Sequence, residues 1–227
     1  VRTLKDDFYI LGEIWHSAQP WLNGDEFTGV MNYDYTGAII NHFIKHELSS
    51  QGLVDRLSHQ LMLYRDQTNA MMFNVLDSHD TARIMTLANE DDQLVRQTLA
   101  FTFLQPGSPS IYYGTEYGMT GGNDPDCRKP MNWYPDAKAI AMHDFVRDLI
   151  KWRKEHWQLI AQGTIELTAL NDNQGVVIKR RRNNQQLVAV FNTSSEPLQV
   201  TLAPFFAQGF SNGILLPKGF AVAALSE

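Results

Sequence analysis

The feature that most constrains the fold of this chain is the alternation of apolar runs with helical patterns over its first 160 residues. Apolar runs of strand length occupy residues 8–15, 27–33, 70–76 and 110–113. Apolar residues recur at helical spacing over residues 36–48, 53–65, 93–105 and 137–155. Residues 8–15 are apolar on both faces, as expected of a parallel strand covered by helices. Four strand–helix units predict a parallel sheet with crossover helices, which is half of a (β/α)8 barrel.

The pattern changes after about residue 162, where short strands are expected in place of helices. These strands are separated by clusters of Asn, Asp, Gly and Pro and cover residues 165–167, 176–179, 187–191, 198–202 and 221–225. Such spacing is typical of an antiparallel sandwich. We therefore predict an α/β fold. The carboxy-terminal half of a barrel (strands five to eight) occupies residues 1–160, and an all-β sandwich domain occupies residues 161–227.

Two shorter segments also receive an interpretation. Residues 1–5 are too short for an element of their own and are interpreted as the end of a helix. The run Arg180-Arg181-Arg182 is the only dense basic stretch, and it precedes Asn183-Asn184 between two apolar runs. This position favours an exposed arm of a β-hairpin over a phosphate-binding site.

Charge and cysteine content narrow the possible functions. The formal net charge of −6 argues against binding to nucleic acid or anionic membranes, whereas it suits a neutral glucan. No stretch approaches the ~18 apolar residues that a membrane span needs. Cys127 is the single cysteine, which excludes an intrachain disulfide and favours a reducing, cytoplasmic location. The seven histidines lack metal-ligand spacing, so neither a metal nor a cofactor is predicted. Because Val1 is not an initiator Met, we expect the true start upstream, where any signal peptide or calcium site would have to lie.

Polar and aromatic residues gather where the predicted strands end. Glu13 lies late in the first strand and is followed by Trp15 and His16, and His79-Asp80 follow the third strand. The carboxyl ends of parallel strands meet at one edge, so these side chains are expected to converge. Glycoside cleavage needs a carboxylic acid that protonates the leaving oxygen and rings that hold the sugar. The pattern therefore predicts a glycosidase site.

These positions resemble motifs of the α-amylase family. Leu-Gly-Glu13-Ile-Trp15-His16 resembles the motif of the fifth barrel strand, where the family's Glu is the general acid/base. Phe-Asn-Val-Leu-Asp-Ser-His79-Asp80-Thr-Ala-Arg resembles the seventh-strand motif, whose His-Asp pair binds the distorted sugar and stabilises the transition state. The resemblance implies that Glu13 and Asp80 are catalytic. It also implies that His79, Trp15 and His16 contact the substrate.

The loop after the eighth strand resembles one subgroup of that family. Gly-Gly-Asn-Asp124-Pro-Asp-Cys-Arg128 is similar to the loop of neopullulanases, cyclomaltodextrinases and maltogenic amylases, and the preceding residues 106–116 resemble the eighth strand. In that subgroup an Asp and an Arg four residues later hold the non-reducing side of the glucan, which implies substrate binding by Asp124 and Arg128. The resemblance covers the whole chain. It implies retaining hydrolysis of α-glucosidic bonds in starch-derived glucans or cyclodextrins.

The chain departs from the family pattern in one decisive way. The family nucleophile is an Asp in a Gly-x-Arg-x-Asp context at the end of the fourth strand, and no such motif occurs here. The third-strand Asn-His motif is also missing, and Ser17, Ser108 and Thr115 stand where close relatives are expected to have Asp, Thr and Asp. We therefore expect this chain alone to be inactive. A half-barrel has two open edges, so we also expect it to self-associate or to need the missing amino-terminal half.

Other interpretations of the same residues stay open. Glu13 could be a solvated strand-edge residue, and Asp80 could cap the following helix. Asp124 and Arg128 could form no more than a loop salt bridge, and Asn32 and Tyr33 could simply pack the top of the barrel. If Glu13 is the acid, it must keep its proton near neutral pH, which requires partial burial or a neighbouring carboxylate.

Two other classes of function fit the sequence less well. One is a non-catalytic glucan-binding module, and the other is a structural or assembly partner. Within the enzyme class, α-glucosidase or α-amylase specificity is the second choice. Should the chain alone prove active, Asp34 or Asp77 would have to act as the nucleophile.

Overall fold

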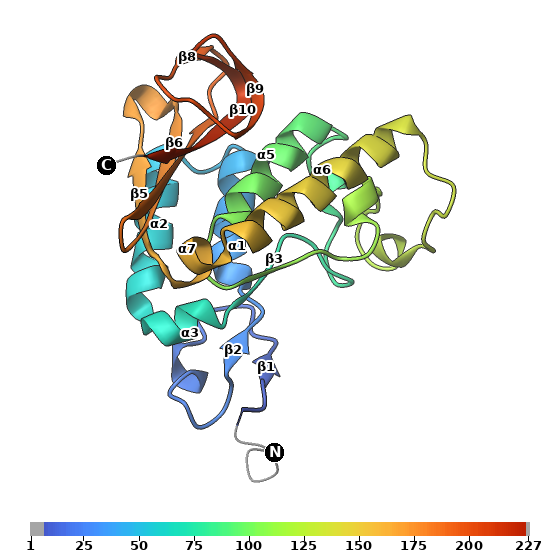
Figure 1. The fold of residues 1–227 in the computed structure, drawn as a ribbon. Coiled ribbons are helices and arrows are strands. Elements are labelled where there is room, and N and C mark those ends of the chain that lie inside the picture. The colour runs from blue at the N-terminus through green and yellow to red at the C-terminus, as the bar shows by residue number, and fades with distance from the viewer. Residues whose placement is uncertain (1–6, 226–227) are drawn as a thin grey trace.

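The computed structural model describes residues 7–225, so the helix end predicted for residues 1–5 lies outside the described residues. Four short parallel strands form its first part: β1 (Leu11–Gly12), β2 (Gly29–Val30), β3 (Phe73–Val75) and β4 (Ser108–Ser110). β1 pairs with β2, β3 pairs with β4, and a parallel bridge between Met31 and Phe73 joins the two pairs. The strands therefore lie side by side in chain order, as the alternation of elements predicts (Figure 1).

The strands are much shorter than predicted. In the run 8–15 only the two residues of β1 are strand, and the run 110–113 shares only Ser110 with β4. A strand needs hydrogen-bonded neighbours, and among the described residues β1 pairs with β2 alone. Phe8, Tyr9 and Leu11 are accordingly 48%, 41% and 38% exposed.

Seven α-helices and four short 3-10 helices are described. The α-helices are α1 (Tyr33–Phe43), α2 (Ser50–Leu63), α3 (Asp66–Ala70), α4 (Ile84–Leu87), α5 (Asp92–Phe103), α6 (Ala137–Glu155) and α7 (Trp157–Gln162). The 3-10 helices are η1 (Gln19–Trp21), η2 (Thr115–Tyr117), η3 (Asp126–Arg128) and η4 (Asn171–Asn173). Three of the long helices begin at side-chain caps. Ser49, Asp91 and Asp136 accept hydrogen bonds from backbone N–H groups of α2, α5 and α6.

Six antiparallel strands follow, as the change of pattern after residue 162 predicts. They are β5 (Thr164–Ala169), β6 (Gly175–Arg182), β7 (Gln185–Asn192), β8 (Leu198–Gln199), β9 (Phe206–Ser211) and β10 (Ile214–Leu225). All six are hydrogen-bonded into one sheet, whereas the predicted sandwich would have two. β10 carries an irregularity between Leu215 and Phe220, where its partners change, and the sheet curls there in Figure 1. The curl encloses a small second core that includes Val190, Val200 and Leu215.

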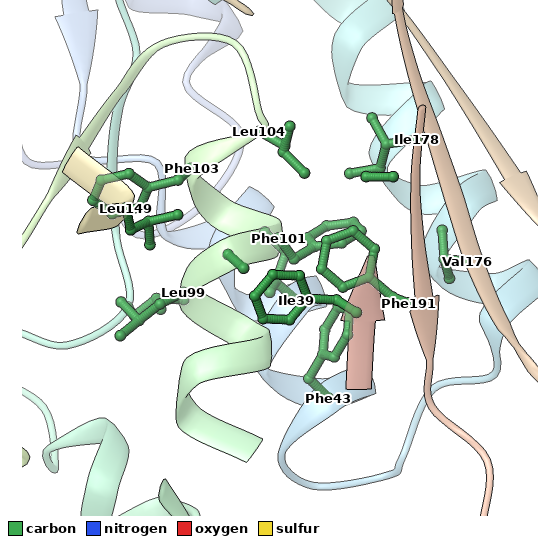
Figure 2. Close-up of a cluster of buried hydrophobic side chains, with 14 of the residues drawn as sticks. Ile39, Phe43, Leu99, Phe101, Phe103, Leu104, Leu149, Val176, Ile178 and Phe191 are labelled. Carbon is green, nitrogen blue, oxygen red and sulfur yellow. The ribbon is translucent and has the colours of Figure 1, made fainter. Parts of the chain in front are cut away.

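The main hydrophobic core is shared by the helices and the antiparallel sheet. Phe43 of α1, Phe101 of α5 and Phe191 of β7 meet in its centre (Figure 2). The ring centroids of Phe43 and Phe101 are 4.8 Å apart, and those of Phe101 and Phe191 are 5.1 Å apart. All three rings are essentially inaccessible to solvent. The antiparallel sheet therefore stabilises the helices that connect the parallel strands.

The basic run at the end of β6 corrects one prediction. The hairpin turn lies at Asn183-Asn184, as expected, and Asn183 has a positive φ of 52°. Arg180, however, is fully buried rather than exposed, because it shares the inward face of β6 with Val176 and Ile178. Its guanidinium donates hydrogen bonds to the carbonyl oxygens of Ile160 and Gly163 at the end of α7. It thus stabilises a helix C-terminus.

Candidate active site

The site residues lie on the loops that follow the four parallel strands. Glu13 and Trp15 follow β1, and Tyr33 is the first residue of α1, directly after β2. His79-Asp80 follow β3, and the long loop between β4 and α6 carries Asp124 and Arg128. Because parallel strands present their carboxyl ends at one edge, loops from distant parts of the sequence meet there.

Tyr33 contacts both the fifth-strand and the seventh-strand motif. The Trp15 ring stacks on it with a centroid separation of 3.8 Å and an interplanar angle of 5°. Burial raises the pKa of the Tyr33 hydroxyl. The negative charges of Glu13 and Asp80 raise it further, and its hydrogen bond to Ser78 opposes them. Tyr33 therefore joins the fifth-strand motif, through Trp15, to the seventh-strand motif, through Ser78.

Arg128 links Asp80 to Asp124. Its guanidinium lies 2.8 Å from the Asp80 carboxylate and 2.8 Å from that of Asp124. Its Nε also donates to the carbonyl oxygen of His79 at 2.9 Å, and the His79 ring lies 3.1 Å from the Asp80 carboxylate. The planar fork of Arg suits such simultaneous contacts. The side chains of Arg128, Asp80 and Asp124 are 47%, 33% and 54% exposed, so a ligand has access to them.

A buried layer beneath these residues ties the loops together. The Arg83 guanidinium lies over the rings of Tyr112 and Tyr113 at 4.6 Å and 4.7 Å, and it donates to the Tyr113 carbonyl oxygen at 2.6 Å. Asp77 accepts hydrogen bonds from the backbone N–H of Ile84 and from the Thr115 hydroxyl. Burial raises the pKa of Asp77, and these hydrogen bonds partly oppose the rise. The layer fixes the positions of the loops after β3 and β4.

Two other predicted residues have different surroundings. His16 is exposed, and its ring packs edge-on against Trp21 at 5.5 Å rather than against Tyr33. Glu13 is exposed as well, so the described residues do not provide the partial burial that its proton-donating role requires. Cys127 is fully buried, and its Sγ lies 3.1 Å from the His79 carbonyl oxygen.

The two alternative nucleophiles lie in unsuitable places. Asp34 sits in the first turn of α1, where it forms a 2.9 Å ion pair with Arg56 and accepts a hydrogen bond from Gln60. Asp77 is 3% exposed and its oxygens already accept hydrogen bonds. Across residues 7–225, no group of three or more His, Cys, Asp and Glu side chains could hold a metal ion. No helix in this range is long and apolar enough to cross a membrane.

From the sequence alone, Arg83 is only part of a motif, and a packing role for Tyr33 stays open. Tyr33 carries a signal that the sequence does contain, since it ends the predicted strand 27–33 in Asn32-Tyr33-Asp34. Arg83 carries none, because a single Arg before an apolar helix is read as exposed unless its contacts are known.

Comparisons with known proteins agree with this geometry. Residues 1–196 match the family described as alpha amylase, catalytic domain. An intracellular maltogenic amylase of Bacillus subtilis is 43% identical over 203 residues, which cover 89% of this chain and 34% of that protein. A cyclomaltodextrinase of Geobacillus thermopakistaniensis is 40% identical over 210 residues, or 92% of this chain and 35% of that protein. The chain thus spans about a third of the length of these relatives.

A solved structure shows the same fold. The cyclic alpha-maltosyl-(1→6)-maltose hydrolase of Arthrobacter globiformis superposes with a TM-score of 0.87 and 26% sequence identity. The superposition covers all of this chain and 51% of that one. The sequence-based resemblance to enzymes that include maltogenic amylases, cyclomaltodextrinases and neopullulanases is confirmed.

Proposed function

The chain belongs to the α-amylase family, and on that premise we propose that it carries two of the three catalytic carboxylates of a retaining α-glucan hydrolase. Glu13 is the general acid/base and Asp80 stabilises the transition state. The observation that carries the proposal is the contact of Tyr33 with Trp15 of one motif and with Ser78 of the other, together with the ion pairs by which Arg128 joins Asp80 to Asp124. The third carboxylate, the nucleophile, belongs to a segment outside these 227 residues.

Each residue has a defined task in this mechanism. Glu13 donates its proton to the oxygen of the departing sugar and then takes a proton from the attacking water. The Asp80 carboxylate accepts hydrogen bonds from the reacting sugar ring, and the His79 ring donates one to it. These bonds strengthen as positive charge develops on the sugar. The nucleophile would stand ~5–5.5 Å from Glu13, as in other retaining glycosidases. Trp15, stacked on Tyr33 and 50% exposed, offers an aromatic face to a neighbouring sugar.

The substrate we propose is an α-1,4-linked glucan or a cyclodextrin. Relatives named for maltogenic, cyclomaltodextrin and cyclic maltosyl-maltose activity support this class. Asp124 and Arg128 hold the non-reducing side of the glucan in this proposal, since their ion pair lies next to Asp80. A cytoplasmic location is proposed from the relative that is named intracellular.

Alone, this chain should not turn over substrate. Retaining hydrolysis begins with attack by the nucleophile, whereas Asp34 is paired with Arg56 and Gln60 on the helical side and Asp77 is buried. The exposed Glu13 and the exposed apolar residues beside β1 support a second segment that covers this edge. We therefore propose that the chain acts with the missing half of the barrel, and that it self-associates when that half is absent.

The test compares the chain and its Glu13→Gln variant on a chromogenic maltoside and on a cyclodextrin, with and without a co-expressed amino-terminal half from a homologous maltogenic amylase. We expect no turnover by the chain alone and turnover after the half is supplied, which Glu13→Gln abolishes. Turnover by the chain alone would contradict the assignment of the nucleophile. Glucan binding that Glu13→Gln and Asp80→Asn leave unchanged, without turnover in either arm, would instead identify a binding module.

A further inference from the structure

A pocket of about 560 Å³ lies far from the candidate active site, at the other end of α6. α6 begins just after the loop that carries Arg128, and its last residue, Glu155, borders the pocket. A 19-residue helix is about 28 Å long, so the two places are separated by roughly that distance. Figure 1 shows α6 running from that loop towards α7. The pocket therefore has no part in the chemistry proposed for Glu13 and Asp80.

Two exposed aromatic side chains border this pocket. Trp157 is 50% exposed and Phe205 is 47% exposed, although each has a large apolar surface that folding normally buries. The Phe205 ring lies parallel to the His156 ring, with centroids 5.4 Å apart and an interplanar angle of 5°. His156 in turn stacks on Trp152 at 5.3 Å and is hydrogen-bonded to the Trp152 carbonyl oxygen. Phe205 is thus held on one side by a rigid stack while it remains accessible to a ligand.

The polar part of the lining consists mainly of side-chain amides. Asn184, Gln185 and Gln186 come from the turn and the start of β7, and Gln158 comes from α7. The charged side chain of the lining is that of Glu155, apart from His156 when it is protonated. The amides donate and accept hydrogen bonds, the carboxylate accepts them, and neither group attracts an anion. A phosphate or a nucleic acid therefore does not fit, whereas a neutral polyhydroxyl compound does.

We propose that this pocket is a second, non-catalytic site for a neutral oligosaccharide. A pyranose ring has an apolar C–H face, which would lie on Trp157 or Phe205, and a rim of hydroxyl groups, which the amides would bind. The volume lies within the range of small-molecule sites, and half of the lining residues carry polar side chains, which suits a ligand with many hydroxyl groups. The occupant is an α-glucan, and this choice of sugar rests on the proposed function.

A second site has a defined physical effect. When a long glucan binds at one of two sites joined by a rigid helix, its free part is held near the other site at a high effective concentration. A long glucan that reaches both sites therefore binds more tightly than a short one. Short oligosaccharides, which cannot reach both sites, should gain nothing from it.

The test is affinity electrophoresis of the whole chain in native gels that contain amylopectin, with calorimetric titration of maltoheptaose. We expect Trp157→Ala to weaken the affinity of the second site at least fivefold, and Phe205→Ala to do the same. Leu216→Ala is the matched control, since Leu216 is 51% exposed on β10 outside the pocket, and it should leave binding unchanged. Far-ultraviolet circular dichroism and thermal unfolding establish that each variant is folded.

Variants at the candidate active site separate this inference from the proposed function. Trp15→Ala and Asp80→Asn should weaken the first site and leave the second intact. If they change nothing while Trp157→Ala still weakens binding, the second site stands and the proposed function fails at its own site. If Trp157→Ala and Phe205→Ala both leave maltoheptaose and amylopectin binding unchanged, the inference is overturned. It is overturned equally if Trp157→Ala lowers the mass measured by light scattering without changing sugar affinity, because the pocket would then be a contact between copies of the chain.

Discussion

Replacing Arg128 with lysine should separate the positioning of the site from the stability of the fold. The substitution keeps the positive charge and removes the fork that contacts Asp80, Asp124 and the His79 carbonyl oxygen together. All three side chains are a third or more exposed, so each ion pair contributes only about 0.2–1 kcal/mol to folding. We expect a loss of about 1 kcal/mol or less, which lowers the melting temperature by about 2–4 °C in a chain of this size.

The effect on glucan binding should be larger. Without the fork, Asp80 and Asp124 are no longer held in place before the sugar binds. Ordering them on binding lowers the binding free energy by about 1–2 kcal/mol, which is a reduction in affinity of roughly 5- to 30-fold. Calorimetric titration of maltoheptaose measures it best in the Trp157→Ala background, where the second pocket no longer contributes.

Arg147→Lys is the matched control for this experiment. Arg147 is 58% exposed on α6 and forms ion pairs with Asp144 and Asp148, away from the site. It should leave sugar affinity unchanged. The reasoning is refuted if Arg128→Lys lowers the melting temperature by more than about 6 °C, or if it leaves the affinity for maltoheptaose unchanged.

Three further predictions address the hydrophobic core, the buried Asp77 and the Tyr33 ring. Phe191→Ala should lower the free energy of unfolding by about 3–5 kcal/mol in urea titrations, because it leaves a cavity among fully buried rings. The raised pKa of Asp77 means that the folded state binds its proton more tightly than the unfolded state. The wild type should therefore gain stability relative to Asp77→Asn as pH falls from 7 towards about 4, where the unfolded carboxyl also takes up its proton. Urea titrations at several pH values measure this difference. Tyr33→Phe should cost about 0.5–1.5 kcal/mol through the lost bond to Ser78 while leaving Trp15 fluorescence unchanged, whereas Tyr33→Ala should shift that fluorescence by unstacking the ring.

The contrary outcomes are equally definite. A loss below about 1 kcal/mol for Phe191→Ala would mean that the sheet is not part of the main core. A stability difference between wild type and Asp77→Asn that does not change with pH would mean that Asp77 is solvated. Unchanged fluorescence in Tyr33→Ala would mean that Trp15 does not stack on Tyr33 in solution.

The sequence was sufficient to predict the order of the parallel strands, and the candidate site was inferred from the same local patterns. Apolar runs that end in Glu13 and in His79-Asp80 can be recognised without any tertiary information. Strand lengths could not be predicted, because they depend on which neighbours bond to an edge such as β1. The antiparallel pairing after residue 162 was predicted, whereas the curl of a single sheet depends on the irregularity within β10.

The residues that were misjudged all depend on long-range contacts. Arg180 looked like part of an exposed basic run, but strand alternation places it on the inner face, where the carbonyl oxygens of Ile160 and Gly163 accept hydrogen bonds from it. Arg83 and Asp77 form contacts with residues 30 and 38 positions away, and no local pattern reports such contacts. Tyr33 acquires its role only when Trp15 from another strand stacks on it.

The order in which the three central rings of the core are synthesised also affects the folding of the nascent chain. Phe43 and Phe101 emerge from the ribosome well before Phe191, and about 150 residues separate the first ring from the last. At ~5–20 residues per second, the apolar face of α1 waits about 7–30 s, and that of α5 about 5–18 s, for the strand that covers them. During that interval they are open to aggregation, so the yield of folded protein should depend on translation speed and on chaperones as much as on the stability of the finished fold.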